Sequence, residues 1–337
     1  MNNILITGGA GFIGSNFIRL LLSQTQYNIV NLDALSFTGN ISNIQDFQDH
    51  SHYRFIKGNI CNKQLVNEII NEFKIDAIIN FAAETHVDRS LLNPSDFIQS
   101  NIVGVEALLE ATVENHIERF IQISTDEVYG SANPNESFNE NSLLRPNSPY
   151  AASKASADLI VRSFIQSYEA PAIIIRSTNN FGQYQHIEKF IPLSVTCIMN
   201  NQKIPIYGTG ENRRDWLYVE DNCRAILSIF ENGKIGEIYN VSANNEKSNI
   251  EIANIILNYF GKNQEMIEFV DDRPAHDLRY SIDSSKIRNE LGWMPIYSFE
   301  FAINRTIEWY INNQSWINNI LKDENFQKYY NIQYRSV

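Results

Sequence analysis

The stretch that decides the fold is "TGGAGFIGS", Thr7–Ser15, which follows the apolar segment "NILIT" directly. Gly9, Gly11 and Gly14 fit GxGxxG, and Gly8 with the last two fits GxxGxxG. One glycine permits a tight turn, Gly11 lets the backbone approach a pyrophosphate, and Gly14 lets the next helix pack against the strand. That helix directs N–H groups and a positive dipole end at phosphates. The residues predicted to lie along a dinucleotide here are Gly8, Gly11, Phe12, Ile13 and Gly14.

An acidic residue at the expected distance selects the dinucleotide. Asp33 ends the apolar segment "NIVNLD", about twenty residues after the loop, where a carboxylate binds the adenosine ribose hydroxyls. It would repel a 2′-phosphate, so NAD is favoured over NADP. A glycine-rich turn without a ligand is the alternative. The strand before, the helix after and the acid at this spacing all favour the cofactor site.

Strand and helix patterns alternate through the first half of the chain. Apolar strands are predicted at "NILIT", "NIVNLD", "YRFIKG", "DAIINFAA", "RFIQIST" and "PAIIIRS", and helices over 12–23, "KQLVNEIINEF" and "NIVGVEALLEATVEN". This order predicts an α/β protein with a Rossmann-type, doubly wound parallel sheet. After about Phe181 the pattern loosens and the elements shorten. We therefore predict an NAD-binding domain over 1–180, rejoined by 215–245 through "GEIYNVS", and a smaller substrate-binding domain over 181–330.

Composition excludes several classes of function. The formal net charge of the 337 residues is -12, which argues against nucleic-acid binding. No apolar run is long enough to span a bilayer, and "MNNILITGG" does not resemble a signal peptide, so no membrane partner is expected. The three cysteines are far apart and odd in number, which favours a reducing cytoplasm. The spacing of histidines and acids shows no metal-site pattern.

"SPYAASKAS" places Tyr150 and Lys154 four residues apart behind a helix start at Ser148 and Pro149. Both side chains then share one helix face. A tyrosine is a poor base at its free pKa of about 10. A neighbouring ammonium together with a positive nicotinamide ring would favour the phenolate, which can then take a proton from a sugar hydroxyl. An ordinary exposed Tyr/Lys pair is the alternative, and the glycine loop favours the catalytic interpretation.

"STDEVYG", Ser124–Gly130, sets Asp126 and Glu127 side by side after the buried strand "RFIQIS". Carboxylates at the end of such a strand are costly to desolvate. Oxidation and reduction at one carbon do not need them, whereas removal of water from a sugar needs a base and an acid. The environment must then keep one carboxyl protonated and the other ionised. A solvated or helix-capping acid pair is the alternative.

These motifs together resemble the extended short-chain dehydrogenase/reductases. "NFAAETHVDRS", "NNFGQYQHIEKFIP", "RRDWLYVED" and "DDRPAHDLRYSID" further resemble the dTDP-glucose 4,6-dehydratases, over Met1 to about Tyr310. The Thr-Asp-Glu triplet is the most specific part, because epimerases and decarboxylases of the superfamily usually lack the acid pair. The resemblance implies dehydration of dTDP-glucose to a 4-keto-6-deoxy sugar nucleotide, with Glu127 as the C5 base, Asp126 as the C6 acid and Thr125 on the C4 oxygen.

The resemblance also implies the rest of the site. Beyond the glycine loop and Asp33, it implies cofactor contacts at Asn59, Ile60, Ala82, Ala83, Tyr150, Lys154 and Asn180. Contacts to the nucleotide sugar are implied at Thr85, His86, Asn179, Lys189, Pro205, Tyr207, Arg214, Asn249, Arg273 and His276. His86 and His276 have a structural role as their alternative. Arg213 is expected to be a solvated neighbour of Arg214.

The sequence departs from the family pattern at two places, and the resemblance also implies a dimer interface. Asn59 stands where the family usually shows Asp beside adenine, and His186-Ile187 stands where a proline commonly precedes Glu-Lys. Both departures concern the nucleotide end of the site, so the same dehydration of UDP- or CDP-glucose is the nearest alternative. A 4-epimerase and a non-catalytic NAD-binding protein are more distant ones. The family dimerises through paired helices, so a homodimer through "NIVGVEALLEA" and the helix of Tyr150 is expected.

Overall fold

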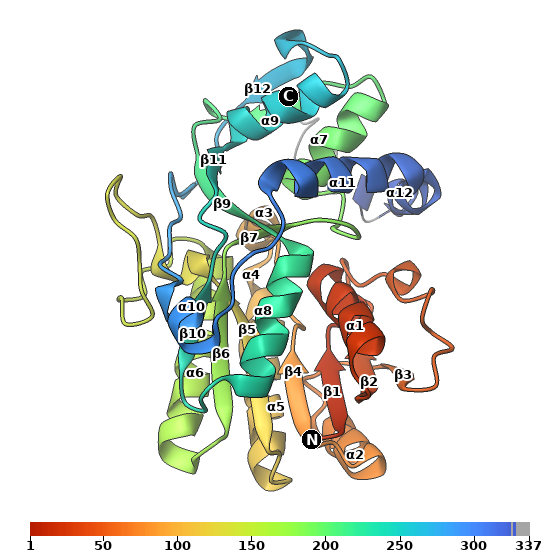
Figure 1. Cartoon of the computed structure of the whole chain (residues 1–337), viewed down its shortest axis with the longest axis vertical. Helices are drawn as coiled ribbons and strands as arrows, with labels where there is room; N and C mark the ends of the chain where they lie inside the picture. Colours follow the sequence, from red (N-terminus) through yellow and green to blue (C-terminus); the bar gives the residue numbers. More distant parts are fainter. Residues whose placement is uncertain (325, 328–337) are drawn as a thin grey trace.

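The structure, a computed structural model, describes residues 1–324, 326 and 327. Its centre is a seven-stranded sheet of order β10-β6-β5-β4-β1-β2-β3, in which every neighbouring pair is parallel (Figure 1). The strands are β1 (Asn3–Thr7), β2 (Asn28–Asp33), β3 (Tyr53–Lys57), β4 (Ala77–Asn80), β5 (Arg119–Thr125), β6 (Ala172–Ser177) and β10 (Ile238–Val241). The predicted Rossmann-type sheet is confirmed, and "GEIYNVS" does return to it.

Helices cover both faces of this sheet. Alternate side chains of β1 show the division, because Ile4 and Ile6 join one buried cluster and Leu5 joins another. The first cluster is packed by α1 (Phe12–Gln24) and α8 (Val219–Asn232). The second is packed by α2 (Lys63–Phe73), α5 (Gly104–Glu114) and α6 (Pro149–Tyr168). Figure 1 shows α1 and α8 side by side over the sheet.

Short helices connect β4 to α5. They are α3 (Val87–Leu92), α4 (Pro94–Ile98) and a π-helical segment over Gln99–Val103. The helix predicted over 101–115 therefore begins with a π segment rather than as regular α-helix. The fourth strand is also shorter than predicted, since residues 81–83 leave the sheet and line a cavity.

The second half of the chain builds two small sheets beyond the carboxyl ends of the main strands (Figure 1). One contains β7 (Asn179–Phe181), β9 (Arg213–Tyr218) and β11 (Glu246–Ser248), and the other β8 (Ile204–Tyr207) and β12 (Ile267–Val270). Their helices are α7 (Phe190–Met199), α9 (Asn249–Tyr259), α11 (Phe299–Asn312) and α12 (Gln314–Leu321). Helix α10 (Ser285–Leu291) instead packs against β10 and α8 of the main sheet.

The predicted shortening of elements is wrong for the helices, because α8 and α11 each have 14 residues. Residues 215–218 lie in the three-stranded sheet, whereas α8 and β10 belong to the main one. The division at 180/181 stays a prediction, and residues 325 and 328–330 of the predicted second domain lie outside the described residues.

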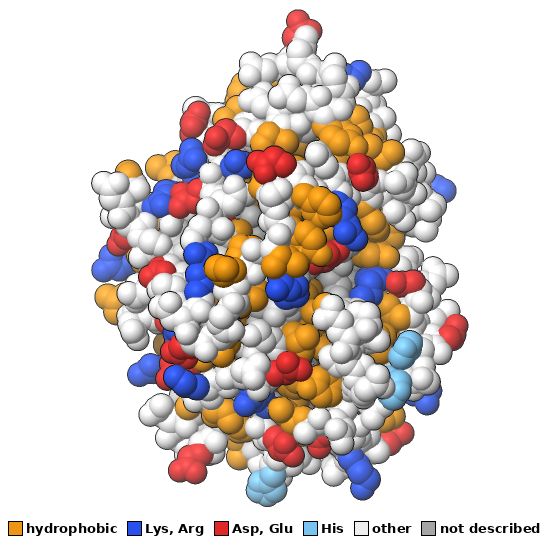
Figure 2. Space-filling view, in the orientation of Figure 1, with side chains coloured by type: hydrophobic (Ala, Val, Ile, Leu, Met, Phe, Trp, Pro, Cys, Tyr) orange, Lys and Arg blue, Asp and Glu red, His pale blue; other side chains and the backbone are white. Residues whose placement is uncertain are grey.

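The surface carries charges of both signs. On the face shown in Figure 2, Lys and Arg are scattered among acidic side chains rather than gathered in one stripe. Within the described part of the chain, no helix has the length and apolar character needed to cross a membrane.

Candidate active site

The glycine loop joins β1 to α1 with no room for larger residues. Gly8 has a φ of +71°, and a Cβ there would lie 2.5 Å from the backbone N of Ala82. A Cβ on Gly14 would lie 2.4 Å from the carbonyl oxygen of Gly8. Helix α1 begins at Phe12 with no side-chain cap at Gly11 and no acid in its first turn. Its first N–H groups are thus available to an anion, as a bound pyrophosphate requires.

We expect Gly8→Ala to disrupt this loop. A side chain in left-handed backbone costs about 1–2 kcal/mol, and the added Cβ would overlap the backbone at Ala82. The variant should be purified with at least about tenfold less NAD, since misplacing the loop removes the phosphate-binding N–H groups. The measurement is NAD released on denaturation. Gly261→Ala is the matched control, because Gly261 also has positive φ, +63°, but nothing lies within 4 Å of its Cβ position. Equal NAD content in the two variants would contradict the prediction.

Two side chains of β2 hold the loop. Asp33 accepts hydrogen bonds from the backbone N of Ala10 (2.9 Å) and of Leu35 (2.7 Å), and Asn31 accepts one from Gly9 N (3.0 Å). Burial raises the pKa of Asp33, while the two backbone donors oppose this shift. Asp33 therefore organises the loop in addition to its predicted ribose contact.

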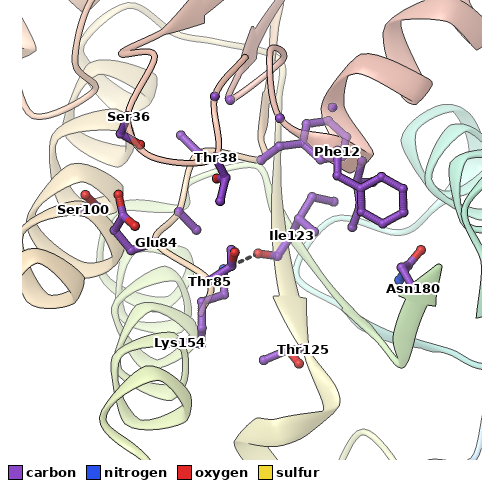
Figure 3. Close-up of a pocket in the computed structure, with 18 of the residues that line it drawn as sticks. Phe12, Ser36, Thr38, Glu84, Thr85, Ser100, Ile123, Thr125, Lys154 and Asn180 are labelled. Carbon is purple, nitrogen blue, oxygen red and sulfur yellow. Dashed lines mark hydrogen bonds between the residues drawn. The ribbon is translucent and has the colours of Figure 1, made fainter. Parts of the chain in front are cut away.

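A single cavity passes from the glycine loop to the end of β5 (Figure 3). It is lined by every residue predicted for the cofactor, by the five predicted catalytic residues, and by Thr85, Asn179 and Lys189 from the substrate set. Polar residues outside the predicted set also line it, namely Ser36, Thr38, Glu84, Ser100, Ser124, Ser177, Thr178 and Gln185, together with His186 of the departure noted above. The loop after β2, the segment after β4 and the π-helical segment supply Ser36, Glu84 and Ser100, which lie near one another in Figure 3.

The acid pair lies where β5 ends. The side chain of Thr125 caps a short 3₁₀ turn, accepting from Glu127 N at 3.3 Å and donating to Asp126 Oδ1 at 3.1 Å. Burial, and then the charge of Glu127, raise the pKa of Asp126 to about 8. Burial also raises the pKa of Glu127, but Arg273 and then Arg214 oppose the rise. The surroundings thus favour a protonated Asp126 beside an ionisable Glu127, as an acid/base pair requires.

Helix α6 supplies the other two catalytic candidates. Ser148 caps it by accepting from Ala151 N at 3.1 Å. Tyr150 and Lys154 both face the cavity, but Lys154 Nζ donates to the carbonyl of Ile123 at 2.6 Å, the dashed line of Figure 3. Burial lowers the pKa of Lys154 to about 8.

The pKa of Tyr150 lies above its ordinary value in the protein alone. Burial and then Glu127 raise it, whereas a hydrogen bond with Thr125 lowers it. The expected lowering of the Tyr150 pKa depends on Lys154 together with a positive nicotinamide ring, so it stays a prediction. A positive nicotinamide ring would have to supply the stabilising charge.

The remaining predicted substrate residues are not part of the wall of this cavity. They are His86, Pro205, Tyr207, Arg214, Asn249, Arg273 and His276. Arg214 donates a hydrogen bond to the backbone carbonyl of Asp277 at 2.9 Å, and the side-chain amide of Asn212 donates to the same carbonyl. The backbone N–H of Asn249 donates in turn to the backbone carbonyl of Asn212. We refer to Tyr207, Arg214, Arg273 and His276 as the grip.

Tyr280 connects the grip to the acid pair, and sequence reasoning missed it although its segment was singled out. Its hydroxyl lies 3.3 Å from Glu127 Oε2 and 2.9 Å from Asp277 Oδ2. The guanidinium of Arg214 lies 4.1 Å from the centre of its ring. Tyr280 therefore touches both the predicted base and a predicted cation of the grip.

The side chains of the two predicted substrate histidines, His86 and His276, are buried, and their surroundings favour the neutral imidazole. Burial lowers the pKa of His86 well below its usual value, and Lys189 and Arg273 add to the shift. Burial, then Arg273, lowers the pKa of His276 to about 4, although Asp272 lies 2.6 Å from its ring. These values favour neutral hydrogen-bonding histidines over cationic clamps.

The departure at His186-Ile187 is accommodated by burial. Ile187 joins the main core, and the ring of His186 lies 5.1 Å from that of Phe37. Burial and then Lys189 lower the pKa of His186 to about 3. Lys189, which follows this segment, donates to the carbonyl of Thr85 at 2.8 Å. The loop thus brings Lys189 to the cavity without the proline.

Two further expectations concern the surroundings. Arg213 is partly exposed and lies 3.4 Å from Glu251, so it faces away from the contacts of Arg214. Among the residues that the structure describes, no three His, Cys, Asp or Glu side chains gather in a way that could hold a metal ion.

Comparisons with known proteins agree with this geometry. A family model described as GDP-mannose 4,6 dehydratase matches residues 5–306. A dTDP-glucose 4,6-dehydratase of Streptomyces niveus is 44% identical over 320 residues, covering 93% of this chain and 94% of that protein. The crystal structure of dTDP-glucose 4,6-dehydratase from Bacillus anthracis in complex with NAD has a TM-score of 0.89 at 44% identity, covering 95% of this chain and 100% of that one. DesIV, a dTDP-glucose 4,6-dehydratase of Streptomyces venezuelae solved with NAD bound, has a TM-score of 0.92 at 41% identity, covering 94% and 99%.

Proposed function

Since the chain belongs to the GDP-mannose 4,6 dehydratase family, we propose that it converts dTDP-glucose to dTDP-4-keto-6-deoxyglucose with NAD as its bound cofactor. The observation that carries this proposal is the placing of Asp126, with its raised pKa, and Glu127 in one cavity with Tyr150 and the glycine loop. A simple dehydrogenase has no use for such an acid pair. A dehydratase requires it.

Tyr150 and Thr125 act on the C4 hydroxyl in this proposal. Tyr150, as the phenolate, takes the hydroxyl proton, and Thr125 at the end of β5 hydrogen-bonds the C4 oxygen. Bound NAD would accept the C4 hydride and return it to C6, so no NAD is consumed. Lys154 holds the carbonyl of Ile123 in the cavity wall and would supply a cationic charge to the bound cofactor.

The acid pair then removes water. Once C4 is a ketone, the proton on C5 is acidic, and Glu127 takes it. Asp126 gives its proton to the C6 hydroxyl, which leaves as water while a C5–C6 double bond forms. Glu127 returns a proton to C5 when C6 receives the hydride. The sugar loses one water and the cofactor ends as it began. Tyr150 then holds one extra proton and Asp126 lacks one, so a proton passed from Tyr150 to Asp126 through solvent restores both groups.

The grip is proposed to hold the nucleoside diphosphate. Arg214 and Arg273 of the grip, together with Lys189 from the cavity wall, supply positive charge, and an arginine fork can bind two phosphate oxygens at once. Pro205 and Tyr207 on β8 are proposed to lie against the base, and Asn179 beside the sugar phosphate. Asn249 and His276 add uncharged hydrogen-bonding groups at the same end.

The activity should fall at alkaline pH with a midpoint near the pKa of Asp126, about 8. Asp126 must be protonated to donate, so below this pH the acid is in its working form. Above it, kcat/KM should decline about tenfold per pH unit. The measurement is the pH dependence of kcat/KM, with Asp126→Asn as the comparison. A profile in the wild type that stays level well above pH 8 would remove Asp126 from the acid role.

The proposal is tested with dTDP-glucose and, separately, UDP-glucose in deuterated water without added NAD, with products followed by NMR. A 4-keto-6-deoxy product carrying deuterium at C5 would establish dehydration, and the faster nucleotide would identify the base preference. A galactose product would indicate the alternative 4-epimerase. Unchanged glucose with tightly bound NAD would indicate a non-catalytic NAD-binding protein.

A homodimer in the cytoplasm completes the proposal. Helices α5 and α6 pack against each other, and apolar side chains of this region remain exposed, including Leu159 (57%) and Ile98 (52%). A second copy of the chain would cover them around a two-fold axis. Sedimentation should show a dimer for the wild type and a monomer for Leu159→Glu. A dimeric Leu159→Glu variant would place the interface elsewhere.

A further inference from the structure

Asp88 is a buried carboxylate that the proposed chemistry does not use. It lies in the first turn of α3, and only 5% of its side chain is exposed. Its Oδ1 accepts from Arg273 Nη1 at 3.0 Å, and its Oδ2 accepts from the Tyr207 hydroxyl at 3.0 Å. A carboxylate removed from water must be matched by donors. These two donors belong to the grip and come from distant parts of the chain.

Arg273 is the cation through which Asp88 reaches the acid pair. Burial disfavours its charge, but Asp88 and then Glu127 raise its pKa. In turn, Arg273 is the strongest cationic influence that opposes the rise in the pKa of Glu127. Arg273 is therefore balanced between two acids. Asp88 holds one edge of its guanidinium fork.

Asp88 also ties two parts of the fold together. Helix α3 follows β4 on the cofactor side, whereas Tyr207 ends β8 and Arg273 follows β12 on the other side. One side chain thus fixes the spacing between the cofactor side and the two residues proposed for the base and the diphosphate.

We propose that Asp88 is a positioning residue, which holds Arg273 and Tyr207 in the orientation that receives the nucleoside diphosphate. The inference rests on the proposed function. The inference extends that function by naming the side chain that orders the grip before the substrate binds. Preordering matters because a flexible arginine otherwise loses conformational freedom on binding.

The test is the binding of dTDP to the NAD-loaded protein, measured by titration calorimetry. Asp88→Asn preserves the shape but removes the counter-charge and sets an amide N–H against one of the two donors. We expect dTDP to bind about tenfold or more weakly, with KM for dTDP-glucose raised in parallel. The kcat at saturation should stay within about threefold, since Asp88 acts on binding through the grip. NAD content should be unchanged.

Asp46→Asn is the matched control. Asp46 also pairs with an arginine, Arg19, with Nε to Oδ2 at 2.8 Å, but it is half exposed and lies outside the cavity wall. This variant should bind dTDP like the wild type. Tyr207→Phe removes a single contact of Asp88 and serves if Asp88→Asn fails to fold. It should raise KM a few-fold, and combined with Asp88→Asn the losses should not multiply, because both act through one carboxylate.

The possible outcomes distinguish a failure of the role proposed for Asp88 from a failure of the proposed nucleotide substrate. Wild-type affinity in Asp88→Asn, or an unchanged KM in Tyr207→Phe where Asp88→Asn does not fold, would overturn the role of Asp88. A wild-type protein that binds no dTDP would instead overturn the proposed nucleotide substrate. A fall in kcat with unchanged KM in a folded Asp88→Asn variant would also contradict a positioning role.

Discussion

Tyr150→Phe is expected to reduce turnover of dTDP-glucose by about 10²–10⁴-fold, the usual contribution of a general acid or base. The substitution removes one oxygen atom and leaves a ring of the same shape, so packing beside Phe97 should persist. Without the phenol, the C4 hydroxyl proton has no acceptor, and oxidation cannot begin. Mixing the variant with substrate should therefore produce no NADH absorbance.

Two controls make this result specific to chemistry. The variant should retain bound NAD, because the glycine loop and Asp33 are untouched. Tyr129→Phe changes another buried tyrosine, whose hydroxyl contacts Asn240 and Arg176 away from the cavity wall. It should affect stability more than turnover. Rapid formation of NADH by Tyr150→Phe would remove Tyr150 from the proposed role.

Much of the fold could be predicted because its signals are local. The inner strands of the main sheet are short apolar runs, as expected for parallel strands buried on both faces, whereas the edge strand β3 is only partly buried. The glycine loop, Asp33, the acid pair and the Tyr/Lys spacing are also local patterns. Every residue predicted from them lines the same cavity, since the carboxyl ends of parallel strands meet at one edge of a sheet.

The parts that escaped prediction depend on distant contacts. Tyr280 lies 153 positions from Glu127, and Arg273 lies 185 from Asp88. Nothing in the sequence near either residue indicates its partner. The three-residue strand β7 could not be predicted for the same reason, because its pairing partner β9 begins more than thirty residues later in the chain. The raised pKa of Tyr150 depends on burial and on Glu127, which the spacing to Lys154 does not disclose.

Glu127→Gln should separate oxidation from dehydration. The amide is nearly isosteric but cannot take the C5 proton, so the reaction should stop after the C4 ketone forms. We expect NADH absorbance to rise to about one equivalent per active site on substrate addition and to persist. Steady-state turnover should fall by about 10²–10⁴-fold. The experiment is a stopped-flow record of NADH together with NMR in deuterated water, in which C5 should remain unlabelled.

The neighbouring acid provides the sharpest comparison for Glu127→Gln. Asp126→Asn removes the proton donor but leaves the base, so Glu127 can still exchange the C5 proton after oxidation. Deuterium should therefore enter C5 in Asp126→Asn and not in Glu127→Gln, although both should turn over slowly. The assignments follow from the surroundings, because Arg273 and Arg214 favour an ionised Glu127 while burial keeps Asp126 protonated. If the two labelling patterns were exchanged, the roles of base and acid would have to be exchanged as well.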